Sequence, residues 1–175
     1  LTIKMDPKQS ASNKDLNISV YDNFFEEEVQ KEIWKKMMRP KWSYTGGGTT
    51  SNRFWHMDGL ENEKYFNEYL YEIICKKLNK KFSNILRIYA NGQTPGQNGS
   101  IHRDDGEMTF LYYANLEWKM EYQGHLNFYI DGGKETVIYK SNRVVLFPAD
   151  LRHCAEAPSN KAKELRVSLA YKLYM

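Results

Sequence analysis

The sequence predicts a mainly β protein of the α+β class: a double-stranded β-helix (jelly roll) with two or more N-terminal helices packed on one sheet. Two observations predict it. Two stretches with apolar residues at helical spacing occur before residue 84, and short apolar or alternating runs follow one another closely after it. Aromatic residues, which favour strands, make up 14% of the 175 residues, and 13 of them are tyrosines.

The first part of the chain divides into a polar segment, a short strand and two helices. Residues 1–15 are polar and predict a loose leader. Residues 17–21 alternate and predict a strand. A helix follows, ends at Pro40 and has an acidic first turn; its apolar positions are Phe25, Val29, Ile33, Trp34 and Met37. A second amphipathic helix is expected over residues 61–79.

Residues 43–53 are rich in glycine and hydroxyl side chains, with three successive glycines. The phosphate-loop pattern is missing, because no Lys-Ser/Thr pair follows these glycines. Either a plain loop or a flexible lid formed by residues 43–55 fits this composition.

The second part of the chain carries about eight short strands separated by Gly, Asn, Asp and Pro, the number expected of a jelly roll. They are expected at residues 84–90, 100–104, 108–114, 125–130, 135–139, 143–147, 152–155 and 164–173. The expected organisation is one domain over 1–175, with a leader (1–15), a strand-and-helix part (16–83) and a jelly-roll core (84–175).

Bulk composition narrows the functional classes. The formal net charge of +3 is weak and forms no basic stripe, so a nucleic-acid partner is not expected. Two cysteines are too few for a disulfide framework. No apolar run reaches the length of a membrane span and no secretory signal is recognisable, so the expected location is the cytoplasm, without a membrane partner.

A His-x-Asp motif and a later histidine form a candidate metal site. His102 and Asp104 are two positions apart, so in a strand both side chains point to the same face. His153 follows in a second predicted strand that a jelly roll could bring alongside. Two histidines and one carboxylate form the ligand set of non-haem iron(II) oxygenases, which leaves coordination positions open. Asp105 is a competing carboxylate, but it would face the opposite side of an ideal strand.

A candidate carboxylate anchor lies 13 residues after His153. Arg166 and Ser168 share one face of a predicted strand whose other positions are mostly apolar. An arginine fork matches a carboxylate in a bidentate way, and a serine hydroxyl can donate beside it. An Arg and a Ser on the inner face of such a strand need a polar partner.

With these pieces in order, residues 84–174 resemble the catalytic core of the prolyl 4-hydroxylase-like 2-oxoglutarate/iron(II) dioxygenases. The resemblance also rests on segments 87–92, 111–115, 124–126 and 146–148. It implies Fe(II) on His102, Asp104 and His153, and 2-oxoglutarate on Arg166 and Ser168. The implied reaction converts 2-oxoglutarate and O2 to succinate and CO2 while hydroxylating a substrate, and ascorbate is a further candidate cofactor.

The same resemblance places two tyrosines near the cosubstrate, and the sequence departs from the family pattern at one position. Tyr89 matches a family tyrosine near the cosubstrate, and Tyr113 matches another that can hydrogen-bond its carboxylate. His125 stands where the family often has a second glycine, and either packing or a place at the pocket mouth is open to it.

The resemblance favours a prolyl residue of a peptide or protein as the substrate, with Arg103 and Trp55 as candidate contacts. Two alternatives remain open. One is hydroxylation of a free amino acid or another small metabolite, and the other is a jelly-roll binding module without catalysis. A nucleic-acid demethylase of the same superfamily fits less well, because the chain has no basic stripe.

Overall fold

The structure, a computed structural model, describes residues 16–46 and 53–175. The leader expected at residues 1–15 and residues 47–52 of the expected lid, with Gly47 and Gly48, lie outside the described residues. The described strands are β1 (Ser19–Tyr21), β2 (Ser43–Gly46), β3 (Arg53–Met57), β4 (Asn84–Gln93), β5 (Met108–Tyr113), β6 (Leu126–Ile130), β7 (Gly133–Val137), β8 (Val144–Pro148), β9 (His153–Ala155) and β10 (Arg166–Tyr174).

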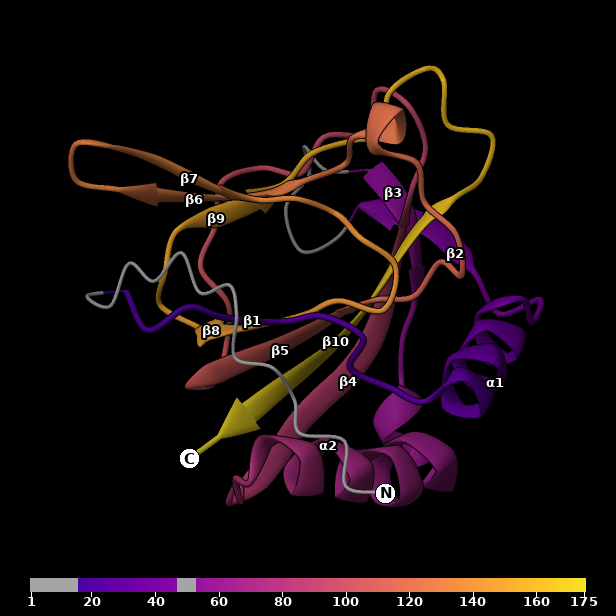
Figure 1. Cartoon of the computed structure of the whole chain (residues 1–175), viewed down its shortest axis with the longest axis vertical. Coiled ribbons are helices and arrows are strands. Elements are labelled where there is room, and N and C mark those ends of the chain that lie inside the picture. Colours follow the sequence, from indigo (N-terminus) through magenta and orange to yellow (C-terminus); the bar gives the residue numbers. More distant parts are fainter. Residues whose placement is uncertain (1–15, 47–52) are drawn as a thin grey trace.

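These strands form two antiparallel sheets, which confirms the predicted mainly β fold. The large sheet has the order β1-β8-β5-β10-β4-β3-β2, and the small sheet has the order β7-β6-β9. Figure 1 shows the small sheet above the large one, with the helices on the far side of the large sheet. Strands distant in sequence are neighbours in each sheet, as expected of a jelly roll.

The helices are amphipathic, and their apolar sides pack against the large sheet. Helix α1 (Glu27–Met37) has acidic residues in its first turn and lysines in its last turn, which suits the helix dipole. The second expected helix is composite: a 3₁₀ turn (Leu60–Asn62), a π-helical segment (Tyr65–Leu70) and helix α2 (Tyr71–Leu78). Asn79 ends α2 in the left-handed conformation, with φ of 49°.

Strand β10 divides the interior into two apolar clusters because its side chains alternate. Val167, Leu169 and Tyr171 pack against the helices. Ala170, from the other set, belongs to the cluster between the two sheets. Arg166, Ser168 and Lys172 share its parity, so they project into the space between the sheets.

The structure differs from the sequence-based expectation in two places. Residues at both ends of the expected 43–55 loop form β2 and β3, which pair with each other and with β4. Residues 100–104 were expected as a strand, but there His102 makes only an isolated bridge to His153. A single bridge replaces a ladder because the chain bends away from β9 after His102, and Asp104 bonds instead to the carbonyl of Ala149.

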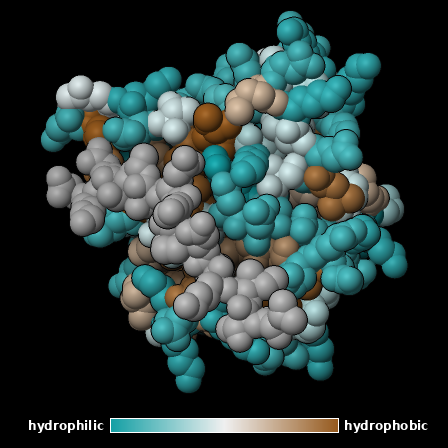
Figure 2. Space-filling model, viewed as in Figure 1, coloured by the Kyte–Doolittle hydropathy of each residue, from teal (hydrophilic) through white to brown (hydrophobic). Residues whose placement is uncertain are grey.

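Hydrophilic side chains dominate the face of the molecule seen in Figure 2, and hydrophobic ones are scattered among them. Within the described ranges, every helix is too short or too polar to cross a lipid bilayer.

Candidate metal centre

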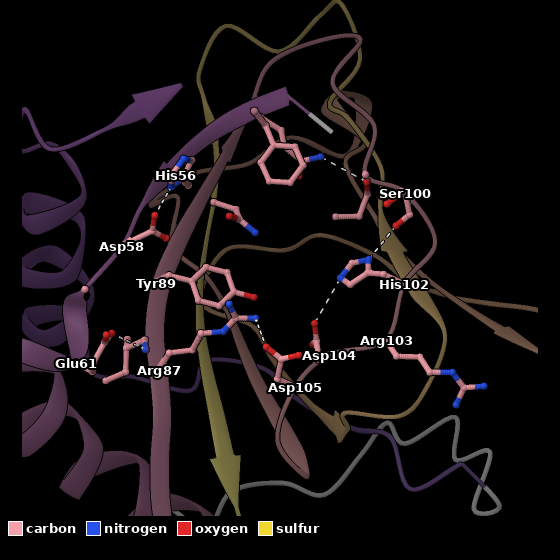
Figure 3. A pocket seen from close by; sticks show the side chains of 17 residues that line it. His56, Asp58, Glu61, Arg87, Tyr89, Ser100, His102, Arg103, Asp104 and Asp105 are labelled. Atoms are coloured by element: carbon pink, nitrogen blue, oxygen red, sulfur yellow. Dashed lines mark hydrogen bonds and ion pairs between the residues drawn. The ribbon is translucent and has the colours of Figure 1, made fainter. Parts of the chain in front are cut away.

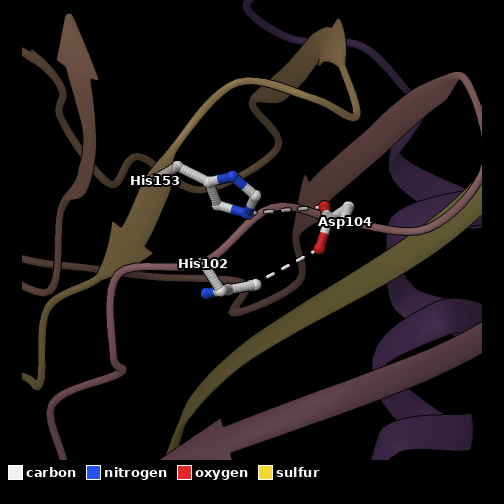
Figure 4. A group of neighbouring side chains, drawn as sticks. All are labelled: His102, Asp104 and His153. Atoms are coloured by element: carbon white, nitrogen blue, oxygen red, sulfur yellow. Dashed lines mark ion pairs between the residues drawn. The ribbon is translucent and has the colours of Figure 1, made fainter.

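A pair of reciprocal backbone hydrogen bonds joins the two candidate histidine ligands. The N–H of His102 donates to the carbonyl of His153 at 3.0 Å, and the N–H of His153 donates to the carbonyl of His102 at 2.9 Å. The two imidazole rings consequently lie with their centroids 4.4 Å apart. Figure 4 shows both rings directed toward Asp104.

Each imidazole is oriented by a second backbone contact. Nδ1 of His102 lies 2.8 Å from the carbonyl oxygen of Ser100, and Nδ1 of His153 lies 2.8 Å from that of Leu151. A carbonyl oxygen can only accept, so each Nδ1 is the donor. In the neutral rings both Nε2 atoms are therefore unprotonated and can bind a metal.

Asp104 completes the group from the turn that follows His102. One carboxylate oxygen, Oδ1, lies 3.4 Å from Nε2 of His102, and the other, Oδ2, lies 3.4 Å from Nε2 of His153. The side chain of Asp104 is only 4% exposed. The donor atoms of the three residues all lie within 4.8 Å of one another.

The pKa values of the three candidate ligands depend on burial, hydrogen bonds and neighbouring charges. Burial alone would raise the pKa of Asp104, but the hydrogen bond from His102 and the charge of Lys172 hold it well below its usual range. The hydrogen bond to Asp104 raises the pKa of His102. Burial lowers the pKa of His153 to about 4, so this ring is neutral at physiological pH.

The donor set fits a divalent metal ion. Two ligands at right angles on an ion lie about 3.0 Å apart when their bonds are about 2.1 Å long, close to the separations observed here. Two nitrogens and one carboxylate from one side leave the other positions open, as in a facial triad. Phe147 stacks edge-on to His153 with ring centroids 4.9 Å apart and closes the inner side of the site.

A cavity of about 720 Å³ opens beside this group. His102 and Asp104 line it together with residues on the inner faces of β3 and β4 (Figure 3). From β4 these are Tyr89, Asn91 and Gln93, which alternate along the strand and therefore share one face. The metal group thus lies at the wall of a space that could admit ligands.

Arg166 is fully buried and is not itself among the residues that line the cavity. Its Nε donates to the carbonyl of Gly124 at 2.6 Å, and its Nη1 donates to Oε1 of Gln93 at 2.8 Å. Gln93 also lines the cavity, so one side chain connects the cavity to the arginine. The guanidinium carbon lies 4.9 Å from the centre of the Tyr139 ring, a distance that allows a cation–π contact.

Nη2 of Arg166 and the hydroxyl of the neighbouring Tyr113 have no hydrogen-bond partner among the described residues. Buried polar groups are nearly always paired, so these two donors are available to a ligand. Burial raises the pKa of Tyr113 to about 12, so its hydroxyl is a donor at physiological pH. A carboxylate would satisfy both, and Ser168 is paired directly with Tyr113 in the β10–β5 register.

The remaining predicted residues take varied positions. Arg103 lines the cavity, but its Nη1 donates to the carbonyl of Asp150 and its side chain points outward in Figure 3. Trp55 does not line the cavity, whereas Phe54 and His56, its neighbours on β3, do. Asp105 pairs with Arg87 at 2.9 Å.

His125 is half-buried, and its Nδ1 accepts a hydrogen bond from the backbone of Tyr139 at 3.2 Å. It is not among the residues that line the cavity. The structure thus gives it a hydrogen bond to the backbone of Tyr139, and both roles considered from the sequence remain predictions.

Sequence reasoning missed three residues that build the site: Gln93, Tyr139 and Lys172. Lys172 is 1% exposed and forms an ion pair with Asp104. A signal for it existed, because it lies six positions after Arg166 and so faces the same side of an otherwise apolar strand. Nothing in the sequence singled out Tyr139, whose hydroxyl lies 2.6 Å from two acceptors, Oδ1 of Asn115 and the carbonyl oxygen of Val167.

Comparison with known proteins gives fold relatives only. No protein-family model matches the sequence, and a search of curated proteins gives no match either. Among solved structures, a Pseudomonas putida prolyl-4-hydroxylase superposes with a TM-score of 0.69 at 14% identity, covering 91% of this chain and 94% of that one.

A prolyl hydroxylase from Trichoplax adhaerens, in complex with a peptide fragment of the hypoxia inducible factor oxygen degradation domain, gives a TM-score of 0.71 at 14% identity. That match covers 91% of this chain and 84% of the other. The epimerase SnoN from nogalamycin biosynthesis, in complex with Fe3+, alpha ketoglutarate and nogalamycin RO, gives a TM-score of 0.65 at 9% identity. That match covers 90% of this chain and 78% of the other. The chain shares its fold with prolyl hydroxylases and other 2-oxoglutarate/Fe(II) oxygenases.

Proposed function

We propose that the protein is an Fe(II)- and 2-oxoglutarate-dependent dioxygenase, with residues 16–175 acting as one catalytic domain. One observation carries the proposal: a His-Asp-His group with correctly oriented nitrogens shares an interior with a buried arginine that has an unsatisfied donor. Metal ligands alone would suit several chemistries. A second, separate anchor for a carboxylate favours a 2-oxo acid cosubstrate.

His102, Asp104 and His153 would hold the iron. When bound, iron and 2-oxoglutarate supply the oxidising chemistry, in which O2 is consumed and succinate and CO2 are released. The backbone carbonyls of Ser100 and Leu151 hold both imidazoles with Nε2 free. The chain itself thus fixes the direction of two ligands before any metal arrives.

Arg166 would receive the distal carboxylate of 2-oxoglutarate, with Tyr113 and Ser168 donating beside it. The stacked rings of Tyr113 and Tyr139, 4.2 Å apart, keep the tyrosine hydroxyl fixed and exclude water around the guanidinium. Low polarity there strengthens a charge-assisted hydrogen bond.

The charges of the interior favour a dianion. Among the described residues, Arg166 and Lys172 are buried cations, and Lys172 forms an ion pair with the buried carboxylate of Asp104. A divalent metal would add two more positive charges. Because uncompensated buried charge is costly, a dianionic ligand such as 2-oxoglutarate fits better than a neutral one.

For the substrate we propose a prolyl residue of a peptide. Two of the fold relatives are prolyl hydroxylases, and the cavity is open and carries two aromatic side chains, Phe54 and Tyr89. A small polar metabolite is a second candidate, favoured by the polar side chains of His56, Asp58 and Asn91 in the same lining.

The cosubstrate assignment is tested by succinate release with Fe(II), ascorbate and varied 2-oxoglutarate. The wild-type protein should release succinate, and R166Q should need about 10- to 100-fold more 2-oxoglutarate, since a hydrogen bond to a charged group contributes about 1.5–3 kcal/mol. R166K should fall between them, because it keeps the charge and loses the fork. The exposed Arg152 gives a control, R152Q, with unchanged requirement. An unchanged requirement in R166Q would contradict the anchor.

The substrate is tested by screening proline-containing peptides against free amino acids for stimulated succinate release. Stimulation by peptides together with a mass gain of one oxygen on proline would support the prolyl proposal. Stimulation by small molecules alone would replace it with the metabolite alternative and leave the cosubstrate assignment intact.

A further inference from the structure

Lys172 lies in the interior, in contact with the proposed metal ligand Asp104. Its side chain is 2% exposed, and its Nζ forms an ion pair with Oδ2 of Asp104. The same Nζ lies 3.1 Å from Oγ1 of Thr109, and that hydroxyl in turn donates to Oδ2 of Asp104 at 2.7 Å. Nζ also lies 5.6 Å from the centre of the Tyr89 ring.

The register of the large sheet explains how these groups meet. Lys172 is paired directly with Thr109 on β5, so both side chains stand next to each other on the inner face. Asp104 approaches from the loop before β5, where its own N–H is held by the carbonyl of Ala149 at 2.8 Å. The three side chains form a closed polar group: lysine, hydroxyl and carboxylate.

The two oxygens of Asp104 therefore differ. Oδ2 contacts Lys172 and Thr109 and lies 3.4 Å from Nε2 of His153, whereas Oδ1 lies 3.4 Å from Nε2 of His102 and has neither the lysine nor the hydroxyl contact. Buried lysines are rare and need a partner, and within the described residues the carboxylate of Asp104 is the anion that Lys172 contacts. Lysine and metal ion would consequently share one carboxylate.

We propose that Lys172 is a built-in counter-ion of Asp104 that sets the metal affinity of the site. It is a positioning residue: together with Thr109 it holds Oδ2, so that a bound metal would share the carboxylate with the lysine. Its charge stabilises the metal-free protein and opposes the arrival of a second cation. This inference rests on the proposed metal site.

The consequence is a linkage between stability and metal binding. Removing the lysine charge takes from the buried Asp104 carboxylate the cation that contacts it, which destabilises the metal-free protein. Metal then restores the missing partner and no longer meets a neighbouring positive charge, so it should bind more tightly. A lysine that only packed against the sheet would not give this coupling, because its loss would weaken both states alike.

The experiment compares K172M with the wild-type full chain, using Co(II) as the metal probe under anaerobic conditions. Metal affinity is measured by calorimetry, and urea unfolding is measured with and without Co(II). K172M should bind Co(II) at least about tenfold more tightly, and it should unfold at lower urea than wild type only when metal is absent. Equal or weaker Co(II) binding by K172M would overturn the proposal.

Two control variants separate charge from packing. T109V removes the hydroxyl but keeps the lysine charge, so its Co(II) affinity should stay within about threefold of wild type. K140M removes a lysine from a surface ion pair with Asp22 and should leave Co(II) affinity unchanged. A tenfold rise in either control would show that the effect does not belong to Lys172, and would overturn the proposal.

If K172M does not fold, the double variant D104N/K172M tests the proposal instead. It removes the charge of the carboxylate together with that of the lysine, so it should fold. If this double variant were as unfolded as K172M, the counter-ion role would be refuted. The wild-type titration tests the metal site separately. A wild-type chain that binds no Co(II) while K172M binds it would contradict the proposed function and support the counter-ion. Absence of binding in both would overturn the two proposals together.

Discussion

Gly124 and Arg166 lie so close that a side chain on the glycine would collide with the arginine. A Cβ on Gly124 would lie 2.8 Å from Cδ and 3.0 Å from Nε of Arg166. The Gly124 backbone also has a φ of +79°, in the left-handed region, and its carbonyl accepts the hydrogen bond from Nε. A glycine at this position therefore leaves the space that the side chain of Arg166, the proposed carboxylate anchor, occupies.

Gly124→Ala should displace the Arg166 side chain. We expect a loss of roughly 1–3 kcal/mol in the free energy of unfolding, from backbone strain and crowding. The 2-oxoglutarate concentration for half-maximal succinate release should rise at least about tenfold. Gly132→Ala is the matched control: its φ is +89°, but no described atom lies within 4 Å of the added Cβ. It should cost stability without changing the 2-oxoglutarate requirement, and equal requirements in both variants would contradict this account.

Tyr113→Phe should weaken cosubstrate binding without loss of stability. The hydroxyl has no protein partner among the described residues, so its removal breaks no internal hydrogen bond. We expect a rise in the 2-oxoglutarate requirement of about threefold to tenfold, the effect of one hydrogen bond of about 0.5–1.5 kcal/mol. Tyr112→Phe, on the opposite face of β5, should leave the requirement unchanged. A reversed pattern between the two variants would place the cosubstrate elsewhere.

Asp22→Asn should cost stability only where Asp22 is ionised. Arg143 contacts both carboxylate oxygens at 2.7 and 3.0 Å, and its hydrogen bond lowers the pKa of Asp22 despite partial burial. Folded protein thus binds this proton less tightly than the unfolded chain, so the contribution is full above the unfolded value of about 3.8 and fades as pH falls.

Since Asp22 is more than a third exposed, solvent screening limits the deficit of Asp22→Asn to about 1 kcal/mol or less at pH 7. Urea unfolding of both proteins between pH 7 and pH 3 measures it, and added salt should reduce it. A deficit that persists undiminished at pH 3 would contradict the ionic origin.

The fold was largely predictable because its signals are local. Alternation within residues 164–173 gave the strand β10 and correctly separated Val167 from Arg166. Strand β2 was not predictable, because its glycine and hydroxyl residues carry no alternating apolar pattern, and β3 was missed although its residues Phe54 and Trp55 favour strands. Their pairing depends on the neighbouring β4, a tertiary effect that single-sequence patterns do not contain.

The three candidate metal ligands were predicted together, but the structure brings them together in a different way from the one expected. Strand alternation was expected to align His102 with Asp104, yet this segment makes only a single bridge. The alignment comes from that bridge to His153 and from the bond between Asp104 and Ala149. Lys172 and Gln93 escaped prediction because their importance lies in partners 63 to 73 positions distant.

The central claim is that one interior binds a divalent metal at His102, Asp104 and His153 together with 2-oxoglutarate at Arg166. Anaerobic addition of Fe(II) and 2-oxoglutarate measures both at once, through the visible charge-transfer absorption of a 2-oxo acid chelated to Fe(II). The account predicts this absorption for wild type, its loss in Asp104→Ala, and a higher 2-oxoglutarate concentration for it in Arg166→Gln. Absence of the absorption in wild type, or its persistence in Asp104→Ala, would contradict the account.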